Sequence, residues 1–202
     1  MGKSLAKKGE QEARESQLQH AIANDDVDEL HDLIVKEQAL LDRVSKHPFP
    51  DTPLHLAAKA GKTQVAMEIA ILKPSFAWKL NPEVDPSSRT IGITPLHYVA
   101  KKKETDELEL LAEFLCACKS SIKDLTSQCE TAVHIAIKNH NLKAFKVLFR
   151  WLKRVHLMDI LAQEDQDGNT VYDIASTMEP QPEELKIRDV RNIQREEMNG
   201  IT

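Results

Sequence analysis

The stretch TPLH, at residues 52–55, recurs along the chain with its threonine at intervals of 42, 37 and 39 residues. It returns as TPLH at 94–97, as TAVH at 131–134 and, altered, as TVYD at 170–173. Self-similarity with a period of about 20–50 residues is typical of chains built from stacked repeats. A catalytic motif would be expected once, so this recurrence predicts a scaffold.

Each repeat has the sequence features of two short helices. Threonine can cap a helix whose first turn tolerates proline, and Gly61 offers the positive φ at which a first helix can end. The following segments have apolar residues three and four positions apart, as in Leu142, Phe145, Leu148 and Leu152. Aromatic residues make up only 4% of the chain, which disfavours a β-sandwich. The predicted fold is an all-α solenoid of helix–turn–helix units joined by short hairpin fingers.

We expect three parts in the chain. Residues 1–13 are charged and polar and are predicted to be flexible, and residues 179–202 are predicted to form a C-terminal capping helix and tail. The repeat array between them, 14–178, divides into about five units with degenerate ends: 14–46, 47–84, 85–125, 126–164 and 165–178.

Two departures from the repeat pattern concern turns and connectors. Lys103 and His140 replace the helix-ending glycine, which costs about 1 kcal/mol per turn if the left-handed conformation is kept. The connector over 73–93 is unusually long. We favour two inter-repeat connectors in tandem, left by the loss of a helix pair, over a simple loop insertion.

Composition narrows the function classes. The formal net charge is −5, so no bulk charge indicates nucleic-acid binding. No apolar run reaches the 18 or so residues of a membrane helix, so direct membrane insertion is not expected. The three cysteines Cys116, Cys118 and Cys129 have no disulfide or zinc spacing, which favours a reducing, cytoplasmic compartment.

The histidines His55, His97 and His134 are the obvious candidates for metal binding or acid–base catalysis. They occupy one equivalent position in three successive repeats, whose helices would lie about 8–10 Å apart. Zinc ligands must each lie within about 2.1 Å of the ion, so these three residues cannot share one. The chain has no phosphate-binding loop and no hydrolase or zinc-protease motif. We therefore predict no catalytic residue, metal site or cofactor.

Lysine recurs at one position of three consecutive repeats, seven residues after the threonine. Stacked, these lysines would form a short basic ladder that steers an acidic partner segment. The alternative is that lysines near a helix C-terminus only favour the helix dipole and solubility. The predicted partner-binding positions, seven and eight residues after each threonine, are Lys59, Ala60, Lys101, Lys102, Lys138 and Asn139.

Lysines and arginines also form a stripe with helical spacing at Lys143, Lys146, Arg150, Lys153 and Arg154. We interpret it as a solvated helix face, with contact to anionic lipid as the alternative. Trp151 and Trp78 are interpreted as packing residues.

The repeated Thr-Pro-Leu-His-x-Ala resembles the signature of ankyrin repeats, over residues 16–178. The resemblance implies that the histidines hydrogen-bond between adjacent repeats, and that partners bind the concave face through the first helices and the finger tips. Structural roles are implied for Thr52, His55, Thr94, His97, Thr131, His134 and Thr170. The implied finger tips are Asp51, Ile91, Ile93, Gln128, Glu130, Asp167 and Asn169.

Longer phrases, such as AMEIAILKPSFAWKLN, KVLFRWLKR and QDGNTVYDIA, resemble the plant ankyrin proteins of defence signalling that carry a PGG-type membrane domain. The resemblance implies a non-catalytic adaptor in plant immune or cell-death signalling, located in the cytoplasm or held at a membrane by its partners. The alternative is a soluble regulator or decoy that associates with full-length membrane relatives. The sequence holds no PGG-type domain, and we expect a soluble, degenerate relative rather than an excised portion.

Overall fold

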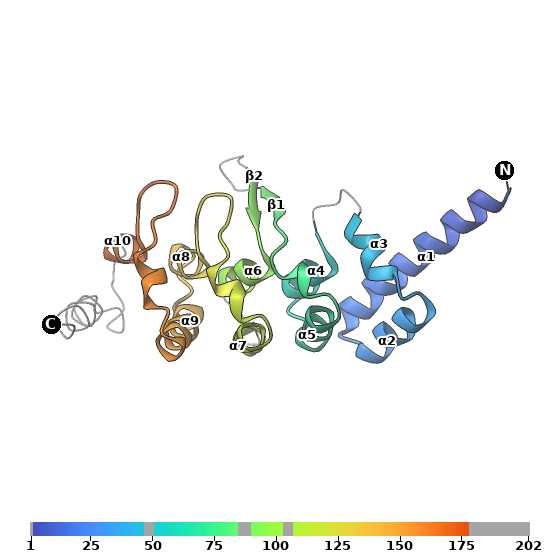
Figure 1. The fold of residues 1–202 in the computed structure, drawn as a ribbon, viewed down its shortest axis with the longest axis horizontal. Coiled ribbons are helices and arrows are strands. Elements are labelled where there is room, and N and C mark those ends of the chain that lie inside the picture. The colour runs from blue at the N-terminus through green and yellow to red at the C-terminus, as the bar shows by residue number, and fades with distance from the viewer. Residues whose placement is uncertain (1, 47–50, 85–89, 103–106, 178–202) are drawn as a thin grey trace.

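The structure, a computed structural model, describes residues 2–46, 51–84, 90–102 and 107–177. Its helix pairs stack one after another into an elongated array, which confirms the predicted all-α solenoid (Figure 1). The described elements are α1 (Gly2–Asn24), α2 (Val27–Lys36), α3 (Leu40–Lys46), α4 (Pro53–Ala60), α5 (Thr63–Leu72), η1 (Pro74–Phe76), β1 (Asn81–Val84), β2 (Thr90–Ile93), α6 (Pro95–Lys101), α7 (Glu107–Ala117), η2 (Lys119–Lys123), α8 (Ala132–Lys138), α9 (Leu142–Val155), η3 (Met158–Ala162) and α10 (Val171–Ser176).

The helices form two rows. Helices α1, α4, α6, α8 and α10 contact one another in sequence and make the inner row, from whose side the hairpins project (Figure 1). Helices α2, α5, α7 and α9 make the outer row. We call the surface formed by the hairpins and the inner row the inner face; the ankyrin resemblance implies that it is the concave one.

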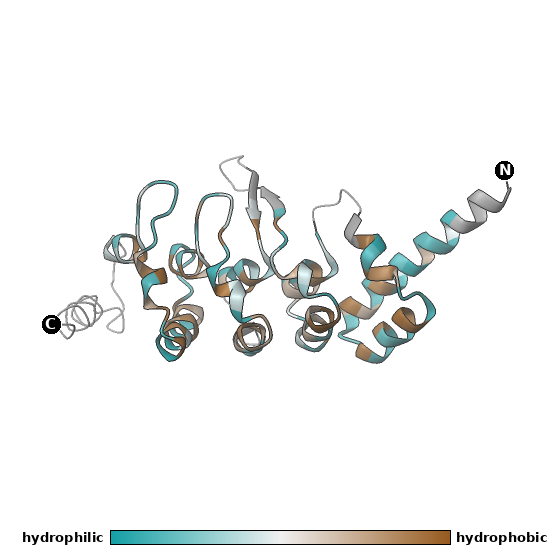
Figure 2. Ribbon diagram, viewed as in Figure 1, coloured by the Kyte–Doolittle hydropathy of each residue, from teal (hydrophilic) through white to brown (hydrophobic). Residues whose placement is uncertain are grey.

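The core lies between the two rows. Small residues of the inner row, among them Ala57, Ala100 and Ala136, are fully buried and let neighbouring helices approach closely. Large residues fill the spaces behind them, and the aromatic rings of Phe76 and Phe114 are fully buried. The hairpin loops before α8 and α10, in contrast, are largely hydrophilic (Figure 2). Each unit therefore buries its apolar face both between its own two helices and against its neighbours.

Left-handed residues end the first helix in three units. Gly61 has φ 67°, and the equivalent residues Asp25 and His140 have φ 57° and 54°. His140 thus keeps the left-handed conformation of the helix-ending glycine that it replaces. Lys103 lies outside the described ranges. Asp25 also accepts the backbone N–H of Val65 at 2.8 Å, so it caps helix α5 of the next unit.

The long connector contains a single enlarged hairpin. After η1, strand β1 pairs antiparallel with β2, in a register that sets Asn81 opposite Ile93. Helices α4 and α5 pack directly on α6 and α7, so the stack continues without a gap. A simple insertion into one hairpin accounts for these described residues, and the tandem-connector interpretation is not needed.

The N-terminal segment differs from the expectation of a flexible stretch over residues 1–13, because α1 runs through it from Gly2. Strong helix formers dominate the segment, and Lys8 lies 3.8 Å from Glu12 one turn later. The end of α1 buries Leu18, Ala21 and Ile22 in the core. The predicted capping helix within 179–202 falls outside the described residues.

Replacing His140 with glycine is expected to raise the free energy of unfolding by about 0.5–1 kcal/mol, because glycine adopts the left-handed conformation without a Cβ penalty. His140 is exposed, so little packing is lost. Urea unfolding measures the change. The matched variant Gly61→Ala should lower the same free energy by about 1 kcal/mol, and a destabilised His140→Gly would contradict the conformational explanation.

Candidate protein-binding surface

Each histidine of the repeated motif is placed to connect its own unit to the next. In the second unit, the backbone N–H of Thr52 donates to Nδ1 of His55 at 3.3 Å, and the Thr52 hydroxyl lies 2.8 Å from the same nitrogen. Nδ1 is therefore the acceptor, which leaves the proton on Nε2. Nε2 donates to the carbonyl of Ile93, just before the next unit's threonine, at 3.1 Å.

The third unit repeats this arrangement. His97 accepts from the backbone of Thr94 and donates from Nε2 to the carbonyl of Glu130 at 3.1 Å. In the fourth unit His134 accepts from Thr131, but its Nε2 has no hydrogen-bond partner among the described residues. In the last unit, Asp173 takes the histidine position, and its carboxylate accepts from the backbone of Thr170 at 2.9 Å.

The three imidazoles are held neutral. Burial lowers the pKa of His55 to about 4 and that of His97 to about 4, and it also lowers the pKa of His134. All three side chains are fully buried. A buried imidazole that is neutral at pH 7 and bonded on both ring nitrogens, as in His55 and His97, serves as a structural bridge rather than as an acid or base.

Lys59 takes part in a polar network on the inner face. Its ammonium lies 2.8 Å from a carboxylate oxygen of Asp51 and 4.6 Å above the ring of Tyr98. Burial would lower the pKa of Lys59, but the bonds to Asp51 and Tyr98 raise it overall. Asn81, the first residue of β1, donates to both Asp51 and Tyr98, which joins the β1–β2 hairpin to helix α6.

Lys138 lies between two buried carboxylates. Its ammonium is 2.6 Å from Glu130 and 2.8 Å from Asp165, whose residues are only 3% and 6% exposed. Burial opposes ionisation of Asp165, but the bonds from Lys138 and the Asn169 backbone lower its pKa overall. Lys59 and Lys138 are therefore neutralised within the chain, which reduces their capacity to attract an acidic partner.

The remaining positions of the predicted ladder end their helices. Lys101 is the last residue of α6 and Lys102 its C-cap, and both are half-buried. Ala60 is the exposed last residue of α4. Asn139 is the C-cap of α8, and its side-chain amide donates to the carbonyl of Ile135 at 2.7 Å. The structure thus places all six predicted positions at the ends of α4, α6 and α8.

Two of the hairpin fingers are closed by a side chain at their base. The hydroxyl of Thr126 accepts from the backbone N–H groups of Gln128 and Glu130, at 3.2 and 3.1 Å. In the next finger, one carboxylate oxygen of Asp165 accepts from Asp167 and Asn169, at 3.0 and 2.9 Å. These bonds fix the shape of both loops from within.

Backbone hydrogen bonds also join neighbouring fingers. The N–H of Ser127 donates to the carbonyl of Gly92 at 3.0 Å, and the N–H of Gln166 donates to the carbonyl of Gln128 at 2.9 Å. The hairpins at 90–93, 124–130 and 163–169 are therefore connected in series. These bonds fix the positions of neighbouring hairpins, which project in a row along one edge of the inner face (Figure 1).

The predicted finger-tip residues divide into two groups. Asp167 is exposed, and Asp51, Gln128 and Asn169 are half-buried. Ile93 and Glu130 are buried at 3% exposure, because the residue before each threonine supplies the carbonyl that the preceding histidine binds. Asp51 and Asn169 also directly precede a threonine, so these four residues lie at the bases of hairpins rather than at their tips, a correction to their predicted placement. The Ile91 side chain lies outside the described part.

Sequence reasoning missed the internal pairing of the lysines, although the chain contains a signal for it. The acid that pairs with the lysine directly precedes the threonine in both units, as Asp51 for Lys59 and as Glu130 for Lys138. In the third unit the same position holds Ile93. An acid eight residues before a lysine on this framework therefore indicates an ion pair within the unit.

Across the described ranges, no three His, Cys, Asp or Glu side chains are grouped so as to hold a metal ion. The cysteines Cys116, Cys118 and Cys129 are all free thiols. Of the helices that the structure describes, none combines the length and hydropathy needed to cross a bilayer.

The two tryptophans differ in their surroundings. Trp78 is 54% exposed, so it is not the packing residue that the sequence suggests, whereas Trp151 is 8% exposed.

Comparison with known proteins identifies the repeats. Residues 76–159 match the sequence model of the family described as Ankyrin repeats (3 copies). The chain is also 46% identical over 67 residues to the Ankyrin repeat-containing protein BDA1 of Arabidopsis thaliana. That alignment covers 33% of this chain and 16% of the relative. Residues 76–159 are thus ankyrin repeats within an all-α stack of helix pairs, and ankyrin repeats indicate a protein-interaction module.

The buried histidines predict a specific pH dependence of stability. Their folded pKa lies below the ordinary value of about 6.5, so the unfolded chain binds more protons between about pH 6.5 and 4. The contribution of His55 and His97 to the free energy of unfolding should be constant above about pH 7 and fall on acidification, by about 2–3 kcal/mol for each of the two at about pH 4.5. Burial raises the pKa of Asp124 to about 6, which acts in the opposite direction.

The variant His97→Gln isolates one histidine from these other groups, since glutamine can keep the donor to the Glu130 carbonyl but cannot titrate. It should be less stable at about pH 7.5, and its loss of stability between about pH 7.5 and 4.5 should be smaller by about 2 kcal/mol. Urea unfolding at both pH values measures the difference. An unchanged pH dependence would contradict a neutral, buried His97.

Removing Lys138 should destabilise the protein more than removing Lys59. Lys138→Met leaves two buried carboxylates without their cation, at an expected cost of about 2–3 kcal/mol. Lys59→Met leaves Asp51, which is more exposed and still accepts from Asn81, so about 1 kcal/mol is expected. Chemical denaturation of both variants provides the comparison, and equal losses would contradict the role of carboxylate burial.

Proposed function

We propose that the chain is a non-catalytic adaptor that binds partner proteins on its inner face, in plant immune or cell-death signalling. The observation that carries the proposal is the series of fingers joined to one another and to the inner row. Ser127 and Gln166 link the hairpins through backbone bonds, and His55 and His97 bind the hairpin bases. A surface ordered before binding loses little conformational entropy when a partner docks.

The lysine side chains of the inner face differ in how they could contact a partner protein. The side chains of Lys59 and Lys138 are held in ion pairs within the chain. Lys101 and Lys102 are half-buried at the end of α6, in the unit whose pre-threonine position is Ile93. We assign the attraction of an acidic partner segment to Lys101 and Lys102, because they are two adjacent positive charges at the end of one inner-row helix. We assign contact by shape to Asp167 and Gln128.

The proposed biological setting rests on sequence similarity to plant ankyrin-repeat proteins. Phrases in the sequence resemble plant ankyrin proteins of defence signalling, and the curated relative is an ankyrin-repeat protein of a plant. The chain spans 16% of the length of that relative, so the relative's own role reaches this chain only as a proposal. We place the adaptor in the cytoplasm, with any attachment to a membrane made through its partners.

Proximity labelling in plant cells tests the proposal with Lys101→Glu/Lys102→Glu. The paired lysines Lys59 and Lys138 are kept, because changing them would report on stability. A matched control, Lys36→Glu/Lys119→Glu, alters charge equally at two exposed positions of α2 and η2. Thermal unfolding of the purified variants shows that both are folded.

A defined set of labelled proteins should fall at least several-fold with Lys101→Glu/Lys102→Glu and remain with the control. Membrane ankyrin proteins among the lost partners would favour the regulator or decoy alternative over a general adaptor. An unchanged set, or a set of chaperones alone, would contradict binding through this part of the inner face.

A further inference from the structure

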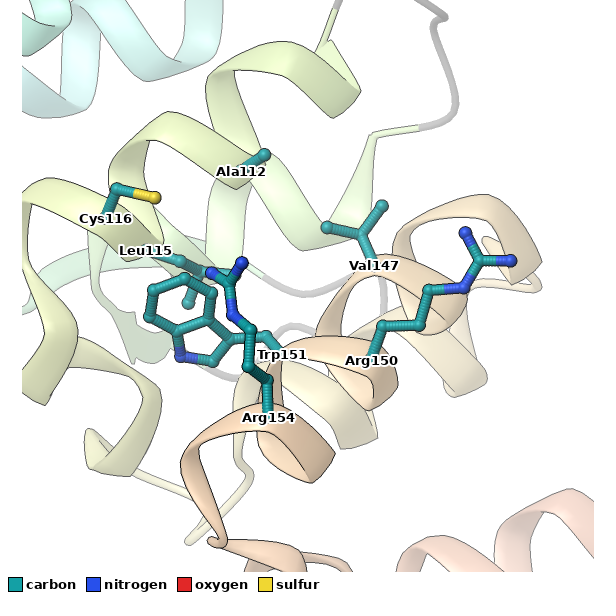
Figure 3. A pocket seen from close by; sticks show the side chains of 7 residues that line it. All are labelled: Ala112, Leu115, Cys116, Val147, Arg150, Trp151 and Arg154. Atoms are coloured by element: carbon teal, nitrogen blue, oxygen red, sulfur yellow. The ribbon is translucent and has the colours of Figure 1, made fainter.

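A recess opens between two helices of the outer row, on the side away from the hairpins. It lies between α7 and α9 and has a volume of about 340 Å³, at the lower end of the ~300–1,000 Å³ typical of ligand sites. Apolar groups form its floor and walls, and two arginines stand at its edge (Figure 3). The lining residues are Ala112, Leu115, Cys116, Val147, Arg150, Trp151 and Arg154.

The two arginines occupy different parts of the recess. The guanidinium of Arg154 lies over the indole of Trp151, 4.6 Å from the ring centroid, and Arg150 extends away from Trp151 past Val147 (Figure 3). They are one helical turn apart on α9, so their cationic groups flank an apolar surface. Stacking on Trp151 limits the motion of the Arg154 side chain while its N–H groups stay available to an anion.

These charges are not neutralised within the described part of the chain. Helix α9 carries five basic residues and no acidic one. No carboxylate of a described residue lies within ion-pair distance of Arg150 or Arg154, and Glu113 of the neighbouring helix pairs with neither. The lysines of the inner face differ, since Lys59 and Lys138 already hold carboxylates. In a chain of net charge −5, this recess is therefore a local basic site.

We propose that the recess between α7 and α9 docks an acidic peptide segment of a partner protein. An apolar side chain of the peptide inserts beside Ala112 and Val147, and flanking carboxylates bind Arg150 and Arg154. Guanidinium groups suit this role, because their planar donors match carboxylate geometry. The site is separate from the inner face and does not rest on the function proposed above.

Two features favour a peptide over a membrane surface. The exposed side of α9 offers charge without large exposed apolar residues to insert into lipid, since those described, Val35, Ile71, Leu72, Trp78 and Leu80, belong to other elements. The apolar part of α9 is also set into a recess rather than protruding. A lipid headgroup would satisfy the arginines but leave the apolar floor uncovered.

Cys116 provides a direct probe, because its exposed thiol lies on the wall of the recess. The full chain with Cys118→Ala/Cys129→Gly keeps Cys116 as its single thiol, and glycine suits position 129 because φ there is 60°. The alkylation rate of Cys116 is measured with short capped peptides in which leucine or phenylalanine is flanked by aspartate and glutamate. Peptides with lysine in place of the acids serve as the peptide control.

Acidic peptides should slow the alkylation of Cys116 at least several-fold at saturation, and lysine peptides should not. Arg150→Gln/Arg154→Gln should weaken the protection by acidic peptides at least tenfold in concentration. Ala112→Phe, which fills the recess, should abolish it, whereas Ala117→Phe, exposed on the same helix outside the recess, should leave it unchanged. Urea unfolding confirms that each variant is folded.

Three results would overturn the proposal. The first is an alkylation rate of Cys116 that acidic peptide does not change at concentrations up to about 1 mM. This measurement uses the chain whose recess lining is unchanged, so it does not depend on the folding of any lining variant. The second is protection by phosphatidylcholine vesicles containing phosphatidylserine but not by peptide, which would assign the site to lipid. The third is protection that rises with protein concentration alone, which would assign it to a second copy of the chain. None of these bears on the inner face, whose test uses different residues.

Discussion

The hydrogen bond from a buried histidine to the next unit's backbone is the interaction on which the stack depends. His55 and His97 each order the threonine that begins their own helix and also hold the base of the next hairpin. One side chain thus fixes a helix start, a finger and the spacing between units. The imidazole must be neutral to play both parts, and burial ensures this by lowering its pKa.

Much of this fold is predictable, because it follows from local chemistry that repeats. The threonine caps, the prolines at the helix start and the apolar spacing all recur at fixed intervals, so the amino-acid pattern alone is enough to place the helix pairs. The long hairpin over 81–93 is a different case. Its strands pair through the backbone, and their residues carry no signal that separates one enlarged loop from two short ones.

The binding surface is less predictable than the scaffold. Recurrence places Lys59 and Lys138 on the inner face, but only three-dimensional contacts reveal that Asp51, Glu130 and Asp165 neutralise them. The basic stripe of α9 has the opposite outcome. Its spacing predicts a solvated helix face, and all of its residues except the half-buried Lys146 are exposed. What helical spacing alone does not describe is the space between α7 and α9, beside which Arg154 stacks on Trp151.

The histidine bridges give the described part of the stack a direction. The bridges from His55 and His97 each point toward the C-terminal neighbour, and His134 faces the backbone of Asn169 in the same way, without a hydrogen bond of ordinary geometry. The last described unit is also held by the Lys138–Asp165 ion pair and by the backbone bond from Gln166 to Gln128. Acidification would therefore loosen this joint by protonating a carboxylate, and the earlier joints by protonating an imidazole.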